Sequence, residues 1–116
     1  MVLCDDARDF LLLLKLLIGT DTTMEVVGEA SNGAEAIVMC TELQPDVLVL
    51  DISMPVMDGM TALPEICRLS PNTNVIMLSG FSSPDLKTQA MHLGAKSFIE
   101  KGAKPTQLTA ILKAHC

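Results

Sequence analysis

The chain has very few aromatic residues and no surplus of positive charge. Its 116 residues include three Phe, no Trp and no Tyr, while 49% of them are hydrophobic. The chain can therefore bury a core, but that core must be mainly aliphatic, with eight Met among its fillers. The formal net charge of −6 disfavours direct binding to nucleic acid or to an anionic membrane, because both carry dense negative charge.

Several common kinds of site also lack their sequence signals. The four Cys are widely spread, with no Cys-x-x-Cys pair and no His at ligand spacing, which favours free thiols in a reducing compartment over a disulfide framework or a zinc site. The most apolar run, 10–18, is interrupted by Lys15, is too short to span a bilayer and does not resemble a signal peptide. No glycine-rich nucleotide-binding motif is present. We expect a cytoplasmic protein whose residues 1–116 form a single domain.

Short apolar runs alternate with helical patterns along the whole chain. The expected strands are Val2–Cys4, Met24–Ala30, Val47–Leu50, Val75–Leu78 and Ser97–Ile99. The expected helices are Ala7–Ile18, one ending near Leu43, one within Gly59–Leu69, one from Pro84 to Leu93 and one beginning at Pro105. Each connection is long enough for a right-handed crossover between parallel strands. The pattern predicts an α/β fold of the flavodoxin-like, doubly wound class, with five strands in the order 2-1-3-4-5 and five helices.

Polar residues and prolines predict where some of these helices begin. Asp6 is a suitable N-cap for the first helix, and Asn32 with Glu35 three residues later resembles a capping box. Pro64 favours Thr61 as the N-cap of the third helix, because proline is tolerated in the first turn whereas an earlier start would force a kink.

Polar side chains follow four of the expected strands. The first strand ends in Asp5-Asp6, the third in Asp51, the fourth in Ser79 and the fifth near Lys101. These groups should converge, because the carboxyl ends of parallel strands share one edge of the sheet. Three carboxylates repel one another unless a cation joins them, and oxygen ligands suit a hard divalent ion, Mg²⁺ first. A carboxylate beside Mg²⁺, a hydroxyl and an ammonium can accept a phosphoryl group.

The order and spacing of these residues resemble the receiver domain of two-component response regulators along nearly the whole chain. The matching positions are Asp5-Asp6, Asp51, Met54-Pro55, Asp58-Gly59, Ser79-Gly80, Gly94-Ala95 and 98–101. The stretch 25–33 is similar to receivers that precede a helix-turn-helix DNA-binding domain of the LuxR/NarL type.

The resemblance implies a role for each residue of the site. Asp51 would be the phosphoacceptor, Lys101 would pair with the phosphoryl group and Ser79 would be the switch hydroxyl. Mg²⁺ would be held by Asp5, Asp6, Asp51 and the backbone carbonyl of Ser53. Phe98 would change rotamer on phosphorylation, although its sequence position is equally compatible with plain core packing.

The resemblance also implies partners. A sensor histidine kinase would donate the phosphoryl group, and the chain would take part in its own phosphotransfer and dephosphorylation without being an enzyme acting on other substrates. Phosphorylation would change the face formed by the fourth helix, fifth strand and fifth helix. That face would control an output. The favoured output is transcription regulation through a fused or separate DNA-binding domain. The resemblance is also compatible with a homodimer.

Two rival interpretations come from other classes of protein. Aspartyl-nucleophile phosphohydrolases of the haloacid-dehalogenase kind combine similar groups, but they carry a second Asp two residues after the nucleophile, where this chain has Ser53. The other rival is a receiver-like interaction module that works without phosphorylation. The apolar first helix would support constitutive association with a partner.

Overall fold

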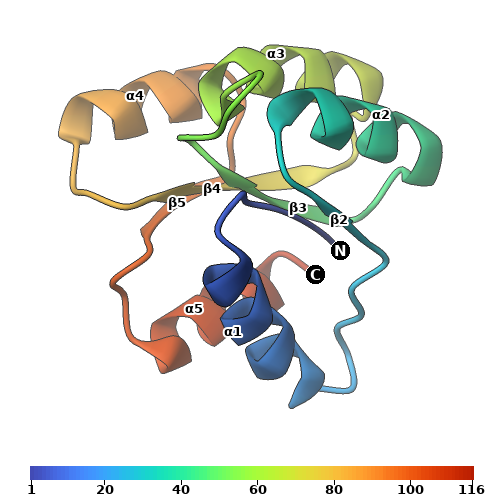
Figure 1. The fold of residues 1–116 in the computed structure, drawn as a ribbon, viewed down its shortest axis with the longest axis vertical. Helices are drawn as coiled ribbons and strands as arrows, with labels where there is room; N and C mark the ends of the chain where they lie inside the picture. Colours follow the sequence, from blue (N-terminus) through green and yellow to red (C-terminus); the bar gives the residue numbers. More distant parts are fainter.

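A computed structural model describes residues 1–116 and confirms the predicted fold class. The strands are β1 (Val2–Cys4), β2 (Gly28–Ala30), β3 (Val47–Asp51), β4 (Asn74–Ser79) and β5 (Ser97–Glu100). The helices are α1 (Arg8–Gly19), α2 (Gly33–Leu43), α3 (Gly59–Leu69), α4 (Pro84–His92) and α5 (Pro105–Ala114). All strand pairs are parallel, in the order β2-β1-β3-β4-β5 (Figure 1). None of the helices is long and apolar enough to cross a membrane.

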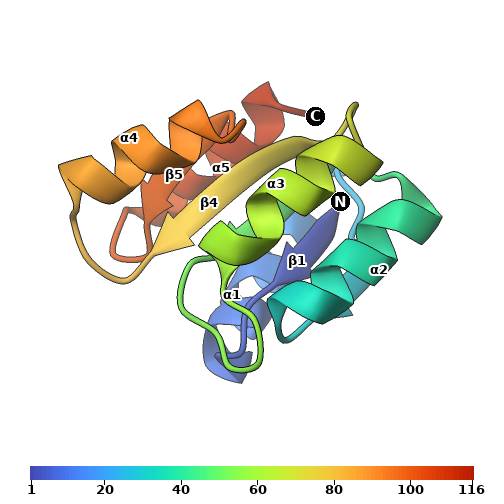
Figure 2. The same cartoon turned by 90° about the horizontal axis from the view of Figure 1, so that it is seen from above.

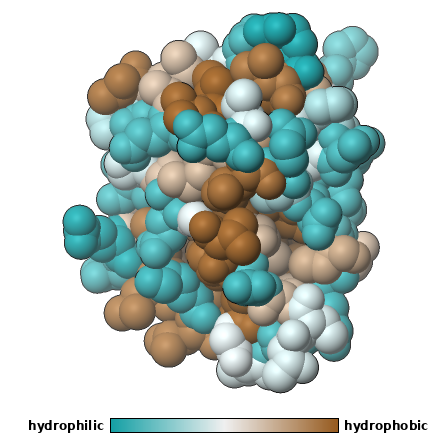
Figure 3. All heavy atoms as spheres, turned by 90° about the vertical axis from the view of Figure 1, so that its right-hand side faces the viewer, coloured by the Kyte–Doolittle hydropathy of each residue, from teal (hydrophilic) through white to brown (hydrophobic).

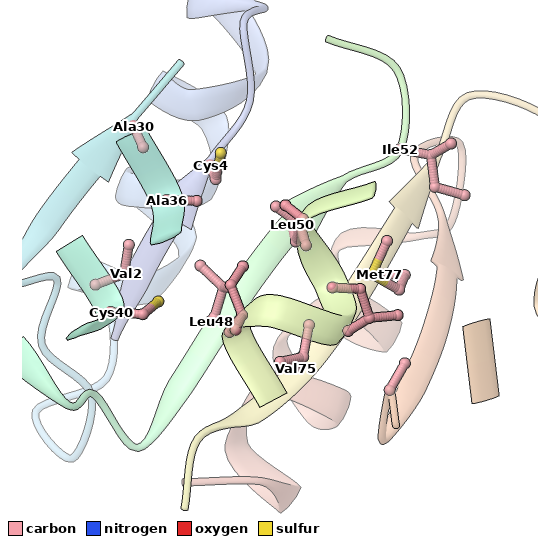
Figure 4. Close-up of a cluster of buried hydrophobic side chains, with 14 of the residues drawn as sticks. Val2, Cys4, Ala30, Ala36, Cys40, Leu48, Leu50, Ile52, Val75 and Met77 are labelled. Atoms are coloured by element: carbon pink, nitrogen blue, oxygen red, sulfur yellow. The ribbon is translucent and has the colours of Figure 1, made fainter. Parts of the chain in front are cut away.

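The sheet is the middle layer of three. Helices α1 and α5 cover one face, and α2, α3 and α4 cover the other (Figures 1 and 2). Side chains alternate between the faces along each strand, so Leu48 and Leu50 join the core under α2–α4 while Val47 and Val49 join the core under α1 and α5. Figure 4 shows part of the first of these cores. Every residue of β3 is buried, which explains its uninterrupted apolar sequence.

The second strand is shorter than the sequence predicts. Residues 24–27 lie outside the sheet, and β2 covers only Gly28–Ala30. In β1 the first paired residue is Val2, which lies opposite Gly28. Val27 therefore makes only a single hydrogen bond at this edge, from its N–H to the Met1 carbonyl at 2.8 Å. The N–H of Met24 donates to the Asp21 carbonyl in a turn instead, so a loosely alternating run did not become a strand.

Two predicted helix starts were wrong, and one cap was partly right. Ala7, which has no capping side chain, occupies the N-cap of α1, so Asp6 is not the cap. Asp58 caps α3 through the Thr61 N–H at 2.8 Å, which leaves Pro64 inside the helix. Gly59 sets this early start because its N–H donates to the Ile52 carbonyl at 2.9 Å.

The predicted capping box of α2 is only half formed. Asn32 accepts a hydrogen bond from the Glu35 N–H at 2.9 Å, as predicted. The Glu35 carboxylate turns instead to Ser31, whose N–H and hydroxyl donate at 2.9 and 2.8 Å. Both side chains therefore still accept backbone N–H groups at the helix start, but Glu35 bonds a residue one position earlier than in the standard motif.

The first helix is apolar on both its buried and its exposed sides. Leu11, Leu14 and Ile18 face the core. Leu12 and Leu16, by contrast, are 57% and 64% exposed. Figure 3 views the side of the molecule where β2 and α2 lie and shows a narrow apolar strip bordered by polar side chains. On α1, the exposed Leu12 and Leu16 make the helix apolar on its solvent side as well as on its core side.

Candidate functional site

Three carboxylates meet where β1 and β3 end. These strands are neighbours, with Cys4 opposite Leu50, so the residues that follow them come side by side. One oxygen from each of Asp5, Asp6 and Asp51 lies within 4.8 Å of the other two. Asp5 and Asp51 are buried, whereas Asp6 is exposed. The three acids thus lie together, as expected from the parallel sheet, and they form a pair of buried acids with a third acid at the solvent side.

Lys101 brings a positive charge to this cluster from the other end of the chain. Its backbone N–H donates to the Ser79 carbonyl at 2.8 Å, which fixes the residue beside the end of β4. Its Nζ lies 2.8 Å from Asp5 Oδ2 and donates to Asp51 Oδ2 at 3.2 Å. Burial opposes the charged ammonium, but the two carboxylates outweigh it and raise the pKa of Lys101. The lysine therefore stays charged and links the two buried acids.

One ammonium does not neutralise the site. Burial, reinforced by the charge of Asp5, raises the pKa of the Asp51 carboxyl to about 6 even though Lys101 acts in the opposite direction. The ionised carboxylate is therefore short of water, and Lys101 does not fully offset this loss together with the charge of Asp5. An additional cation would complete that offset.

The kinds of oxygen atom found at the end of β1 and just beyond β3 fit a hard divalent cation. Asp5 Oδ1 accepts the Ala7 N–H at 2.8 Å, and the polar partner of its buried Oδ2 is the Lys101 ammonium at 2.8 Å. The backbone carbonyl of Ser53, two residues beyond β3, accepts no hydrogen bond from the chain. Carboxylate and carbonyl oxygens beside open solvent are the donor set that Mg²⁺ prefers.

Ser79 and Phe98 make contacts other than those of this cluster. The buried Ser79 hydroxyl donates to the Phe81 carbonyl at 2.6 Å and accepts the Phe81 N–H at 3.2 Å. Phe98 is half-buried on β5, pairs with Met77 and packs against the core under α2–α4. The structure thus brings Asp5, Asp6, Asp51 and Lys101 together, while the Ser79 hydroxyl bonds its own loop and Phe98 packs against the core under α2–α4.

Sequence reasoning missed one residue that touches the site. The ring of Phe10, in the first turn of α1, has its centroid 5.1 Å from Lys101 Nζ. The only sequence signal was its position one helical turn after Asp6. That spacing does not reveal contact with a lysine that directly follows β5.

The sequence as a whole matches a known family. A family model described as the response regulator receiver domain matches residues 1–113. The chain is 38% identical over 112 residues to the chemotaxis protein CheY of Thermotoga maritima, covering 97% of this chain and 92% of the relative. It is also 34% identical to YhcZ of Bacillus subtilis, an uncharacterized transcriptional regulatory protein, covering 99% of this chain and 54% of that protein.

Solved structures agree with the sequence comparison. The signal receiver domain of the response regulator NarL from Mycobacterium tuberculosis superposes with a TM-score of 0.90 at 30% identity, covering 98% of this chain and 93% of that one. The CheX–CheY–BeF3–Mg²⁺ complex from Borrelia burgdorferi gives 0.91 at 28% identity, covering 97% and 85%.

The chain belongs to the response regulator receiver domain family. It is a phosphoacceptor of two-component signalling, for which a histidine kinase is the phosphodonor partner. Receiver domains bind Mg²⁺ at an acidic pocket, and the corresponding cluster of Asp residues is present here. The resemblance seen in the sequence, including that to NarL-type receivers, is confirmed.

Proposed function

We propose that Asp51 is the residue that accepts the phosphoryl group from a kinase phosphohistidine. The observation that carries this proposal is its buried carboxylate at the end of β3, bridged by Lys101 at 3.2 Å and grouped with two other acids. In open α/β sheets, chemistry is placed beyond the carboxyl ends of the strands. Asp5 shares this position, the lysine and the cluster, but its Oδ1 already accepts the Ala7 N–H at 2.8 Å.

The transfer is a direct displacement at phosphorus. An oxygen of Asp51 forms the new bond to phosphorus while the bond from phosphorus to the imidazole nitrogen breaks. The bonding electron pair stays on the imidazole. Lys101 would then pair with a phosphoryl oxygen, and its ammonium already lies within hydrogen-bond distance of the accepting carboxylate. The positive charge that would pair with the transferred phosphoryl group therefore already lies beside the Asp51 carboxylate.

Asp5, Asp6 and Asp51, with the Ser53 carbonyl, would hold Mg²⁺. When bound, the ion supplies positive charge that offsets the charge on the phosphoryl oxygens. Three carboxylates within 4.8 Å of one another, with one ammonium between two of them, and the raised pKa of Asp51 support this assignment.

Ser79 and Phe98 would transmit the change. For its hydroxyl to reach a phosphoryl oxygen, Ser79 must release the backbone of Phe81, to which it is now bonded. Phe98 lines a surface hollow between α4, β5 and α5 together with Lys87 and Ile111. A movement of the ring would therefore alter the face on which an output partner could detect the phosphorylated state.

The output that we propose is control of transcription through a DNA-binding domain, fused or separate. The similarity to NarL and to the longer YhcZ supports it. A role in chemotaxis is the second candidate, favoured by a CheY relative of nearly equal length. Deleting the gene separates them, since a changed transcript profile with normal swimming reversals supports the first and the opposite result supports the second.

Intact-mass measurement tests the phosphoacceptor. Wild type, Asp51→Asn and Asp46→Asn are incubated with Mg²⁺ and acetyl phosphate. Asp46 precedes the same strand at its opposite end, so its variant is the matched control. We expect one adduct of about 80 Da on wild type and on Asp46→Asn, and none on Asp51→Asn. An adduct that persists on Asp51→Asn would assign the phosphoryl group to another residue.

A further inference from the structure

Lys101 has a third neighbour besides its two carboxylates. The ring of Phe10 lies 5.1 Å from the ammonium, measured to the ring centroid, which is within the distance at which an aromatic ring attracts a cation. Phe10 is half-buried and packs against the core under α1 and α5. The ring is thus held by the core on one side and approaches the site lysine on the other.

We propose that Phe10 is a positioning residue for Lys101. This inference rests on the proposed function, in which Lys101 pairs with the phosphoryl group on Asp51. The Lys101 side chain is 23% exposed, so it lies at the boundary between the buried acids and solvent. A long, flexible lysine at such a boundary is easily drawn outward by water. An aromatic ring beside the ammonium opposes that movement.

The ring does this without occupying a hydrogen-bond acceptor site on the phosphoryl group or on the acids. The ammonium has three N–H donors, and Asp5 and Asp51 provide its only acidic contacts. The face of the ring attracts the ammonium electrostatically, as a whole cation, and does not tie up one particular N–H donor. Lys101 can therefore exchange a carboxylate for a phosphoryl oxygen while it keeps its contact with Phe10. The ring would hold the lysine in place before and after the transfer.

A purely structural role for Phe10 makes a different prediction. In that case only the apolar volume of its side chain matters, and a leucine would replace it well. Leu17 is the matched control, because it is another half-buried residue of α1 that packs against the same core. Loss of packing alone should show equally in Phe10→Leu and in a Leu17→Val variant of similar stability.

The experiment compares phosphorylation rates with acetyl phosphate and Mg²⁺, followed by intact mass at donor concentrations below saturation. Phe10→Leu should lower the rate between about two- and thirty-fold, the range expected for loss of a cation–ring contact. Phe10→Tyr, which keeps the ring, should stay close to wild type, and so should Leu17→Val. Urea unfolding of each variant establishes that it is folded.

A second comparison asks whether Phe10 acts through Lys101. In a Lys101→Met background, Phe10→Leu should have no further effect, because no ammonium remains to be positioned. If that background is phosphorylated too slowly to measure, the contrast between leucine and tyrosine at position 10 decides the matter.

The outcomes separate the two proposals. If wild type and Phe10→Leu are phosphorylated at the same rate, the role of Phe10 is overturned while the proposed function stands. Equal losses in Phe10→Leu and Phe10→Tyr, or the same loss with and without Lys101, also overturn that role. A wild type that takes no phosphoryl group overturns the proposed function and this inference with it.

Discussion

The Cα of Gly59 lies directly against the backbone carbonyl of Asp51, so close that no side chain could be added there without displacing one of them. The same glycine donates its N–H to the Ile52 carbonyl at 2.9 Å. The first residue of α3 and the last residue of β3 are thereby held together. The position of the Asp51 carboxylate depends on this backbone contact.

Replacing Gly59 by alanine should therefore damage both stability and phosphoryl uptake. A Cβ would meet the Asp51 backbone, and overpacking of this kind costs about 1–3 kcal/mol. We expect urea unfolding to show a loss of that size and the folded protein to be phosphorylated more slowly. Gly19→Ala is the control, because a Cβ at Gly19 has open space around it. Equal stability of the two variants would refute the importance of the close approach.

Metal-free protein should become less stable as the pH rises towards neutrality. In the folded chain the pKa of Asp51 is raised from 3.8 to about 6 by burial and by Asp5. The folded state then binds its proton more tightly than the unfolded state, so stability falls as the pH rises through this window. The shift corresponds to about 3 kcal/mol at most. Urea unfolding in EDTA between pH 4 and pH 7 measures it.

Asp51→Asn tests the origin of that pH dependence. The variant cannot ionise at position 51, so at pH 7 it should be more stable than wild type. Its free energy of unfolding should also fall much less between pH 4 and pH 7. Asp85→Asn, which changes an exposed acid at the start of α4, should keep the wild-type profile. A decline that survives in Asp51→Asn would place its cause elsewhere.

Magnesium should stabilise the chain through Asp6. A ligand at ten times its dissociation constant stabilises the state that binds it by about 1.4 kcal/mol. Asp6 is exposed and makes no hydrogen bond through its side chain, so Asp6→Asn should fold normally but gain much less from Mg²⁺. Asp9→Asn changes another exposed acid nearby, in the first turn of α1, and should gain as much as wild type. Thermal unfolding with and without Mg²⁺ compares the three proteins.

Val56 should be replaceable by asparagine with a gain in stability. It is 88% exposed and has a φ of 68°, the left-handed region that branched side chains rarely adopt. Asparagine tolerates this conformation, so Val56→Asn should raise the free energy of unfolding by about 1 kcal/mol. Val38→Asn, at an exposed helical position of α2, should change it by less than about 0.5 kcal/mol. Equal effects at the two positions would show that the backbone conformation of Val56 carries no penalty.

Much of the fold could be predicted because its signals are local. The uninterrupted apolar run of β3 indicated a strand buried on both faces, and the acids that follow β1 and β3 had to meet once the sheet was parallel. The predicted start of α3 failed for the opposite reason. The contact between Gly59 and the Asp51 backbone is tertiary, and it outweighed the local preference of Pro64.

Other features depended on where separate elements pack. The contact of Phe10 with Lys101 requires α1 to lie beside the end of β5, which no pattern within either segment specifies. The shortening of β2 follows from the register of β1, in which Val2 is the first residue with a partner. The elevated pKa of Asp51 depends on how completely the surrounding atoms exclude water. Sequence therefore indicated which groups meet, but not their electrostatic balance.

Asp5 and Lys101, joined at 2.8 Å, come from opposite ends of the chain. No fragment that lacks either the first strand or the last can contain the complete site, and partial unfolding at either end removes it. The ability to receive a signal is thus a property of the cooperatively folded chain. A mutation far from the site that merely destabilises the protein would reduce the fraction of competent molecules and leave the rate of each competent molecule unchanged.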